Sequence, residues 1–151
     1  VVFSADCGIL LLHDPEAGCV GAVHAGWRGC AAGIVEKAVR EMVRLLGARP
    51  ERILAAVGPC IGQCCFETDS DVPEAMAASA LGTGAGAYWG RRGAKYHVDL
   101  AGLNRRWLLH AGVLPEHIDV CGLCTACRPD LFWSHRKMGN ARGAQVAMIC
   151  L

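Results

Sequence analysis

An apolar run that leads directly into an amphipathic helix constrains the fold of this chain more than any other feature. The run covers Cys19 to His24, and Ala25-Gly26-Trp27-Arg28-Gly29 joins it to a helix expected from about Gly29 to Leu46. Apolar residues in that helix recur every three or four positions, opposite charged ones, which is typical of a helix packed on a sheet. The first backbone N–H groups of such a helix have no partner within the helix and can bind an anion. The sequence therefore predicts a strand–helix junction that carries a site.

Short apolar runs separated by turn-forming residues predict the other strands. Ile9 to Leu12 and Cys19 to His24 flank a short loop, so we expect these two strands to be neighbours. Further expected elements are strands at Arg52–Val57, Lys95–Val98, Ile118–Cys121, Leu131–Ser134 and Gln145–Leu151, helices at Pro73–Leu81 and from Asp99 to about Ala111, and a flexible loop at Gly82–Ala87. Because strands and helices follow no regular alternation, we expect an α/β fold of the α+β type, with a mixed β-sheet flanked by helices.

The length of the chain favours a single domain over residues 1–151, since one core can be buried at this size but hardly two. The chain opens with Val1 rather than Met, within what reads as a strand. We therefore expect the complete protein to have a further N-terminal part.

Composition and charge bear on partners and compartment. The 15 basic and 14 acidic residues give a net charge of +1, without long basic runs, so nucleic acid is not an expected partner. No membrane partner is expected, because no apolar stretch approaches the roughly 20 residues of a membrane span. Without a signal peptide, and with most of the ten cysteines inside apolar runs, the chain reads as cytoplasmic with reduced thiols. The lack of exposed apolar heptads favours a monomer.

Cys7 and His24 are the first candidates for a site. Each ends or borders an expected strand, and a thiolate with an imidazole is a good pair of zinc ligands. Arg28 lies where the helix dipole disfavours a cation, which suggests a bound anion such as phosphate. Trp27 is placed to stack on a ring, and Arg136, in the basic segment Ser134-His135-Arg136-Lys137, is a second candidate for phosphate. A buried cysteine, a helix-capping histidine and a solvated basic turn are the alternatives.

The other cysteines suggest a competing chemistry. Cys121, Cys124 and Cys127 have the spacing that begins an iron–sulfur or zinc-binding run, although Arg128-Pro129 follows where a fourth cysteine would be needed. The adjacent pair Cys64-Cys65 lacks the spacing of a redox motif, so structural thiols are expected there.

Several motifs occur along the chain in a recognisable order. They are Ser4-Ala5-Asp6-Cys7, His24 to Gly29, Gly58 to Glu67, Asp99-Leu100 with Asn104, Cys124-Thr125, and Phe132 to Arg136. In this order they resemble the laccase-domain family nearly from end to end. That family was described as multicopper polyphenol oxidase, has been called peptidoglycan editing factor, and is now described as purine nucleoside phosphorylase with adenosine deaminase activity.

The resemblance implies a zinc site of two histidines and one cysteine. Cys7 matches the cysteine and His24 one histidine, and the third ligand is expected upstream of Val1. The implied partners are small molecules, a purine nucleoside and phosphate. Arg28 would take part in catalysis and bind phosphate, Arg136 and Arg142 are weaker matches to the family pattern, and Asp6 is a candidate to orient the ligands.

Copper is less expected than zinc. A multicopper oxidase needs many imidazoles, largely in His-X-His pairs, whereas this chain has six scattered histidines and no such pair. Two alternative functions stay open at this point. One is an editing factor for peptidoglycan precursors, and the other is a cysteine-rich redox or iron–sulfur protein built on Cys121, Cys124 and Cys127.

Overall fold

A four-stranded mixed sheet forms the centre of the fold. A computed structural model describes residues 1–151, without the side chain of Thr83. The strand order is β3-β2-β4-β8, where β2 (Gly8–Asp14) pairs antiparallel with β3 (Cys19–Ala25) and β4 (Leu54–Val57), and β8 (Ile118–Val120) runs parallel to β4. The expected pairing of the first two long strands and the expected mixed sheet are both confirmed.

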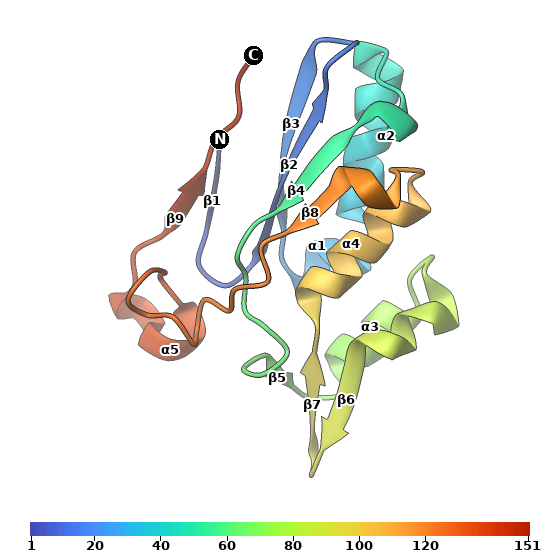
Figure 1. The fold of residues 1–151 in the computed structure, drawn as a ribbon. Coiled ribbons are helices and arrows are strands. Elements are labelled where there is room, and N and C mark those ends of the chain that lie inside the picture. Colours follow the sequence, from blue (N-terminus) through green and yellow to red (C-terminus); the bar gives the residue numbers. More distant parts are fainter.

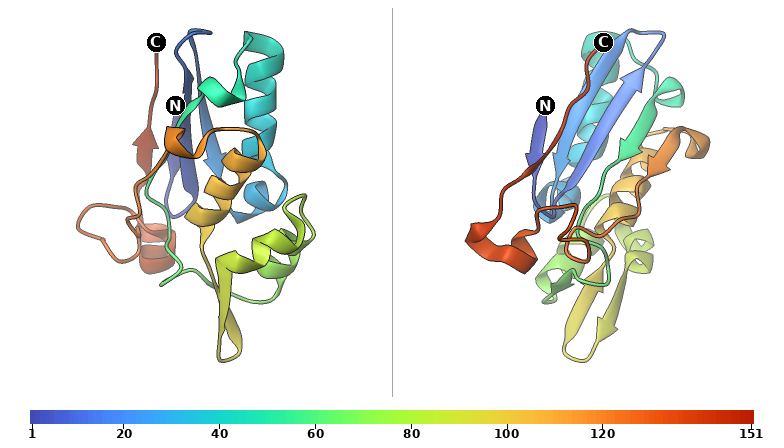
Figure 2. Two further views of the ribbon diagram at one scale, coloured as in Figure 1. Left: turned by 45° about the vertical axis from the view of Figure 1, so that its right-hand side comes forward. Right: turned by 60° about the vertical axis from the view of Figure 1, so that its left-hand side comes forward.

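Helices cover one face of this sheet, and a two-stranded ribbon lies on the opposite side (Figures 1 and 2). The helices are α1 (Trp27–Ala31), α2 (Ile34–Leu46) and α4 (Leu100–His110). The ribbon pairs β1 (Val2–Ser4) with β9 (Gln145–Ala147), so the first and last strands of the chain lie side by side. Asp99 caps α4 by accepting a hydrogen bond from the Gly102 N–H, as the sequence predicts.

A small antiparallel sheet with the strand order β5-β7-β6 lies below the central sheet in Figure 1. Its strands are β5 (Glu67–Thr68), β6 (Trp89–Arg92) and β7 (Lys95–Val98). The remaining helices are α3 (Asp71–Ala77) and α5 (His135–Met138), and the 3₁₀ turns are η1 (Pro50–Arg52), η2 (Gly82–Tyr88), η3 (Pro115–His117) and η4 (Gly139–Ala141).

The core lies between the central sheet and its helices. Val35 and Val39 from α2 pack with Leu10 and Leu12 from β2 and with Trp107 from α4, and all five are at most 2% exposed. Burial of this apolar surface holds the strands in register, because a shift of one residue would turn their apolar side chains to the other face.

The helix expected from Gly29 to Leu46 is broken in two. Gly33 separates α1 from α2 with a backbone φ of +70°, a conformation that glycine adopts at little cost. A Cβ at this position would lie 3.2 Å from the ring of Trp107. The left-handed backbone at Gly33 breaks the helix there, and its close approach to Trp107 leaves no room for a side chain; the spacing of the apolar residues does not reveal this break.

Three other sequence-based expectations differ from the structure. Residues 131–134 were expected to be a strand, but the N–H groups of Leu131 and Phe132 donate to the Arg128 carbonyl in a turn, and Ser134 caps α5. The glycine-rich loop at 82–87 lies in η2 because Ala85 is fully buried in the core. The last strand ends at Ala147 rather than Leu151.

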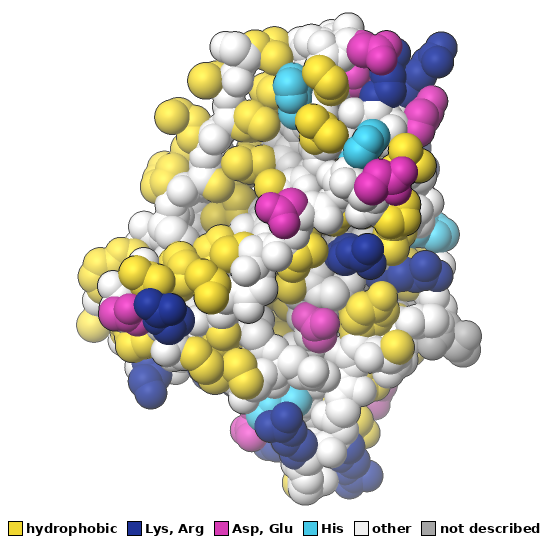
Figure 3. All heavy atoms as spheres, in the orientation of Figure 1, with side chains coloured by type: hydrophobic (Ala, Val, Ile, Leu, Met, Phe, Trp, Pro, Cys, Tyr) yellow, Lys and Arg dark blue, Asp and Glu magenta, His cyan; other side chains and the backbone are white. Residues whose placement is uncertain are grey.

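Apolar side chains gather over the side that carries β1, β9 and the C-terminal segment (Figure 3). Phe3, Val146 and Met148 there are each more than half exposed. Among the described residues, no helix has the length and apolar character needed to cross a membrane.

Candidate functional site

Cys7 and His24 are brought together by the pairing of β2 with β3. Gly8 pairs with Ala25, so the residue before β2 and the last but one residue of β3 lie at the same end of the sheet. A Cβ built on Gly26 would lie 2.7 Å from the Cys7 Sγ and 3.7 Å from the His24 Nε2. The two ligand atoms therefore face one small space beside Gly26, and the absence of a side chain at residue 26 keeps that space open.

The ring of His24 is held in one orientation. Its Nδ1 lies 2.8 Å from the backbone carbonyl oxygen of Phe3 in β1. A carbonyl oxygen can only accept, so Nδ1 carries the hydrogen and Nε2 keeps its lone pair. This is the arrangement in which a metal-binding histidine presents Nε2 to the ion.

The Cys7 thiol has a raised pKa. Burial is the main cause, and the negative charge of Asp6 adds to it, while the positive charge of Arg142 acts in the opposite direction. A cation next to the sulfur would offset both unfavourable contributions, because it stabilises the thiolate.

The donor set at Gly26 fits a metal ion. A thiolate and an imidazole are ligand types that zinc prefers, and both atoms lie within 4 Å of the position that a Cβ on Gly26 would take. In the part of the chain that the structure describes, no third histidine, cysteine or carboxylate side chain joins this pair within ligand distance. The pair therefore offers two candidate ligands and does not by itself form a closed site.

A cavity of about 300 Å³ opens next to Cys7. Its walls combine aromatic and aliphatic side chains, Trp27 and Phe66 among them, with the basic side chains of Arg136 and Arg142. An apolar slot with a cationic rim suits a flat, polar ring that carries or meets an anion. Among the residues named from the sequence as site candidates, Asp6, Cys7, Trp27, Arg136 and Arg142 line this cavity.

Arg28 lies beside the cavity rather than in its lining. Its guanidinium carbon is 4.2 Å from the centre of the Trp27 ring, a cation–π contact that orients both side chains. Its side chain is exposed, so it can swing toward an anion bound at the cavity.

Arg136 is fixed by backbone groups of the loop that precedes α3. Its Nη1 donates to the carbonyl oxygen of Glu67 at 2.8 Å and, more weakly, to that of Cys65 at 3.4 Å. Its guanidinium also lies 5.8 Å from the Phe66 ring centre. Within the described residues, its Nε and Nη2 have no hydrogen-bond partner, so they are available to a ligand in the cavity.

Asp6 connects the site to the rest of the chain, and the sequence offered only a weak indication of this role. It is 8% exposed, with a backbone φ of +85°, which is uncommon outside glycine. Its backbone carbonyl accepts from the Ile61 N–H at 2.8 Å, and its carboxylate accepts from Thr125 and from the Arg136 N–H. Phe66 falls within the motif Gly58 to Glu67 but was not itself named as a site candidate, because an aromatic residue next to two cysteines carries no distinctive signal.

A second cluster of possible ligands lies away from Cys7 and His24. It consists of Cys64, Cys65, Cys124 and Cys127, whose sulfur atoms are all within 4.8 Å of one another. Cys121, expected to join Cys124 and Cys127, is exposed and outside this cluster. The sequence-based grouping was wrong here because the partners come from the distant loop that contains Cys64 and Cys65.

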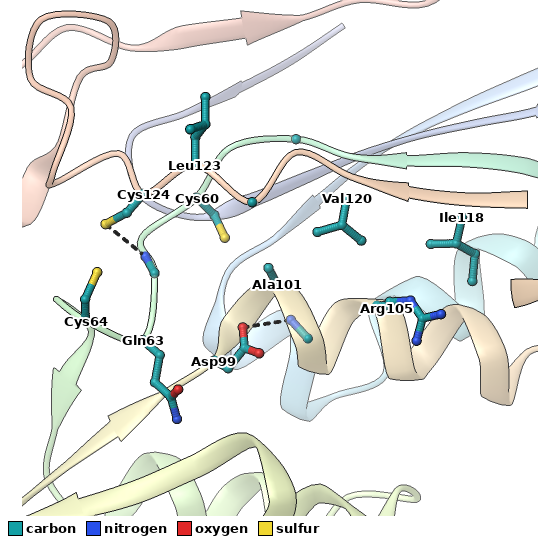
Figure 4. A pocket seen from close by; sticks show the side chains of 14 residues that line it. Cys60, Gln63, Cys64, Asp99, Ala101, Arg105, Ile118, Val120, Leu123 and Cys124 are labelled. Atoms are coloured by element: carbon teal, nitrogen blue, oxygen red, sulfur yellow. Dashed lines mark hydrogen bonds between the residues drawn. The ribbon is translucent and has the colours of Figure 1, made fainter. Parts of the chain in front are cut away.

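Hydrogen bonds and burial give these thiols different acidities. Burial alone would raise the pKa of Cys124, but N–H groups of Gly62 and Cys127 donate to its sulfur and the pKa is lowered. For Cys64 and Cys65, burial and hydrogen bonding with Cys127 raise the pKa. Cys64 and Cys124 also border a larger cavity of about 660 Å³ beside α4 (Figure 4).

Comparison with known proteins decides the family. A family model described as multi-copper polyphenol oxidoreductase laccase matches residues 1–151. The chain belongs to this laccase family. A purine nucleoside phosphorylase of Deinococcus radiodurans is 45% identical to this chain over 148 residues. The matched region covers 98% of this chain and 55% of the Deinococcus protein. Adenosine deaminase RL5, from an unknown prokaryotic organism, is 38% identical over 142 residues, 94% of this chain and 54% of that protein.

Solved structures agree with this membership. The crystal structure of YlmD from Geobacillus stearothermophilus matches this laccase-family protein with a TM-score of 0.85 and 36% sequence identity. The match covers 94% of this chain and 53% of the YlmD chain. The chain therefore spans about half the length of these relatives.

The residues of this laccase-family chain do not fit the copper sites that the family description implies. Multicopper sites need clustered imidazoles. Of the six histidines, only His24 faces Cys7, and His135, the one histidine in the cavity lining, accepts a hydrogen bond from Arg142 through Nδ1. The thiolate–imidazole pair is the donor set that the described residues offer here.

Proposed function

We propose that this protein is a zinc-dependent purine nucleoside phosphorylase that also deaminates adenosine. The names of its relatives support the reaction class, since they include purine nucleoside phosphorylases and an adenosine deaminase. The observation that carries the proposal is the convergence of the Cys7 Sγ and the His24 Nε2 at Gly26, next to a cavity with aromatic walls and a basic rim.

In this proposal Cys7 and His24 hold the metal, with a third ligand expected from a segment upstream of Val1. When bound, zinc supplies Lewis-acid assistance to water or to the substrate at that position. The hydrogen bond from His24 to Phe3 keeps the imidazole in the tautomer that can act as a ligand.

The cavity residues bind and orient the two substrates. Trp27 and Phe66 provide apolar surfaces against which a purine can stack. Arg136, with Arg28 at the side, neutralises phosphate through charge-assisted hydrogen bonds. A phosphate oxygen attacks C1′ of the ribose, the bond from C1′ to the purine nitrogen breaks, and its electron pair leaves with the base, which takes up a proton. The products are ribose 1-phosphate and the free purine.

Deamination would use the same cavity with water in place of phosphate. Water adds to C6 of the adenine ring, and ammonia leaves with one of the transferred protons, which gives inosine. Both reactions require the purine to lie near the Cys7–His24 pair, and they compete for one binding site.

The decisive experiment incubates the full-length protein with adenosine, with and without phosphate, and identifies the products by chromatography. Adenine with ribose 1-phosphate only in the presence of phosphate, or inosine in either case, supports the proposal. The variant His24→Ala should lose more than about 100-fold in turnover together with its bound metal, because loss of a ligand costs at least as much as loss of a group that orients one.

His13→Ala is the matched control, since this histidine lies on β2 away from the cavity and should change neither metal content nor turnover. Unchanged adenosine from zinc-loaded wild-type protein, or full turnover by His24→Ala, would overturn the proposal.

A further inference from the structure

Four thiols from two distant segments meet outside the site described above. Cys64 and Cys65 lie in the turn that follows β4, and Cys124 and Cys127 lie in the loop that follows β8. The Sγ of Cys127 is 3.5 Å from that of Cys64 and 3.4 Å from that of Cys65. None of the ten cysteines takes part in a disulfide in this structure, so each of the four Sγ atoms is free to act as a ligand.

We propose that Cys64, Cys65, Cys124 and Cys127 form a structural zinc site with four cysteine ligands. This site is separate from the Cys7–His24 pair and does not depend on the proposed function.

The distances fit a single tetrahedral ion. Zinc–sulfur bonds of about 2.3 Å in tetrahedral geometry place the ligand sulfurs roughly 3.8 Å apart. The short contacts of 3.4 and 3.5 Å and the outer limit of 4.8 Å lie on either side of this spacing. A cubane iron–sulfur cluster fits less well, because its own irons and sulfides hold the cysteine sulfurs further apart. Four protein ligands leave no open position, which is typical of structural rather than catalytic zinc.

The backbone around the cluster is arranged for close approach. The Gly62 N–H donates to the Cys124 Sγ at 3.2 Å, an interaction that stabilises a thiolate ligand (Figure 4). A Cβ on Gly62 would lie 3.1 Å from the Cβ of Cys124 and 3.4 Å from the Sγ of Cys64, so only glycine gives the two loops this spacing without displacement. Cys60 and Cys124 also form an isolated parallel bridge, with the Thr125 N–H donating to the Cys60 carbonyl.

The cluster joins two segments that build the candidate cavity. Cys65 precedes Phe66, which lines that cavity, and its carbonyl oxygen accepts from Arg136. Cys124 precedes Thr125, which donates to Asp6. A metal ion at the four cysteines would therefore fix both segments relative to Asp6 and Arg136, and any effect of its removal on turnover rests on the proposed function.

The test measures metal by mass spectrometry in full-length protein purified under reducing conditions without chelator. Cys127→Ser and Cys64→Ser should each lower the zinc content by about one equivalent per chain relative to wild type. Cys121→Ser and Cys150→Ser are matched controls, because these cysteines are exposed and outside the cluster, and they should retain the full content. Cys7→Ser should also retain the one equivalent of zinc that is lost in Cys127→Ser.

Cobalt substitution gives a readout that does not depend on the stability of the serine variants. Wild-type protein loaded with Co²⁺ should show intense sulfur-to-cobalt charge transfer and the visible bands of a tetrahedral thiolate site. Cys127→His, which keeps four ligands, should bind cobalt with shifted visible bands and weaker charge transfer. Equal zinc content in wild type and Cys127→Ser, iron in place of zinc, or a disulfide at Cys127 in the reduced preparation would each overturn the assignment.

Discussion

The hydroxyl of Thr125 donates a 2.6 Å hydrogen bond to the carboxylate of Asp6, 119 residues earlier in the chain. The second carboxylate oxygen accepts from the backbone N–H of Arg136 at 2.7 Å. The nearly buried side chain of Asp6 thus positions both Thr125 and Arg136, which lines the candidate cavity.

Replacing this carboxylate should weaken both the fold and the site. Asn tolerates the positive φ of residue 6, so Asp6→Asn tests the carboxylate rather than the backbone conformation. Its amide nitrogen cannot accept a hydrogen bond, so either the Arg136 N–H or the Thr125 hydroxyl loses its acceptor. We expect a loss of about 1–3 kcal/mol in the free energy of unfolding, measured in urea. Asp119→Asn, at an exposed position on β8, is the control and should leave the free energy of unfolding almost unchanged. Equal decreases in the free energy of unfolding for the two variants would contradict the role assigned to Asp6.

Filling the space beside Gly26 should displace the metal at Cys7 and His24. In Gly26→Ala the new Cβ would lie 2.7 Å from the Cys7 Sγ, so the sulfur has to leave its present position. We expect loss of the metal equivalent held by this pair, with a nearly unchanged urea midpoint. Gly90→Ala, where an added Cβ meets nothing within 4 Å, is the control. Unchanged metal content in Gly26→Ala would show that the ion, if bound, lies elsewhere.

Removing the guanidinium of Arg136 should raise the KM for phosphate. Arg136→Met should raise it by about tenfold, the value of one charge-assisted hydrogen bond at an exposed position. The KM for adenosine should change less. In Arg136→Lys the KM for phosphate should rise less than in Arg136→Met, because lysine restores the positive charge. Arg40→Met on the outer face of α2 provides the control. A larger rise in the KM for the nucleoside than for phosphate would assign Arg136 to the purine instead.

The stability of the fold should fall in acid as Asp14 is protonated. Burial raises the pKa of its carboxyl, but hydrogen bonds from the N–H groups of Ala17, Arg49 and Glu16 and from the Arg52 side chain outweigh burial and lower the pKa from 3.8 to about 2. Because the pKa is lower in the folded state, the ionised Asp14 carboxylate stabilises the fold above about pH 4. This stabilisation is lost as the pH falls toward 2 and the carboxylate is protonated. The free energy difference between wild type and Asp14→Asn should therefore narrow across this range in urea unfolding. If the free energies of unfolding of the two proteins fell in parallel with pH, the role assigned to Asp14 would be contradicted.

Local patterns in the sequence predicted much of the central sheet. The runs around Leu10 and Val23 have the length and turn signals of paired strands, and Asp99 is a recognisable cap. Trp89–Arg92 was not recognised as a strand, because Arg91 and Arg92 are exposed and the segment lacks an apolar face. The break at Gly33 was not recognised either, because the apolar spacing continues across it, and the nearness of Gly33 to Trp107 is not contained in any local pattern.

The site could be predicted only where its residues lie close to strand ends. Cys7 and His24 follow from the expected pairing of two neighbouring strands. The contact of Cys65 with Cys127 depends on how two loops fold over the sheet edge, and the spacing of Cys121, Cys124 and Cys127 pointed to the wrong partner. Chemistry can be assigned from residue types, but the grouping of distant side chains needs the three-dimensional structure.

The pairing of β1 with β9 affects the order in which the fold can be completed during synthesis. Phe3, whose carbonyl orients His24, pairs with Val146 in the last strand. On the ribosome, the central sheet can form while the C-terminal segment is still being made, but the pairing of β1 with β9 has to wait until residues 145–147 emerge. A chain that stops before residue 145 would contain both Cys7 and His24 but would lack the strand that pairs with Phe3, whose carbonyl orients the His24 ring.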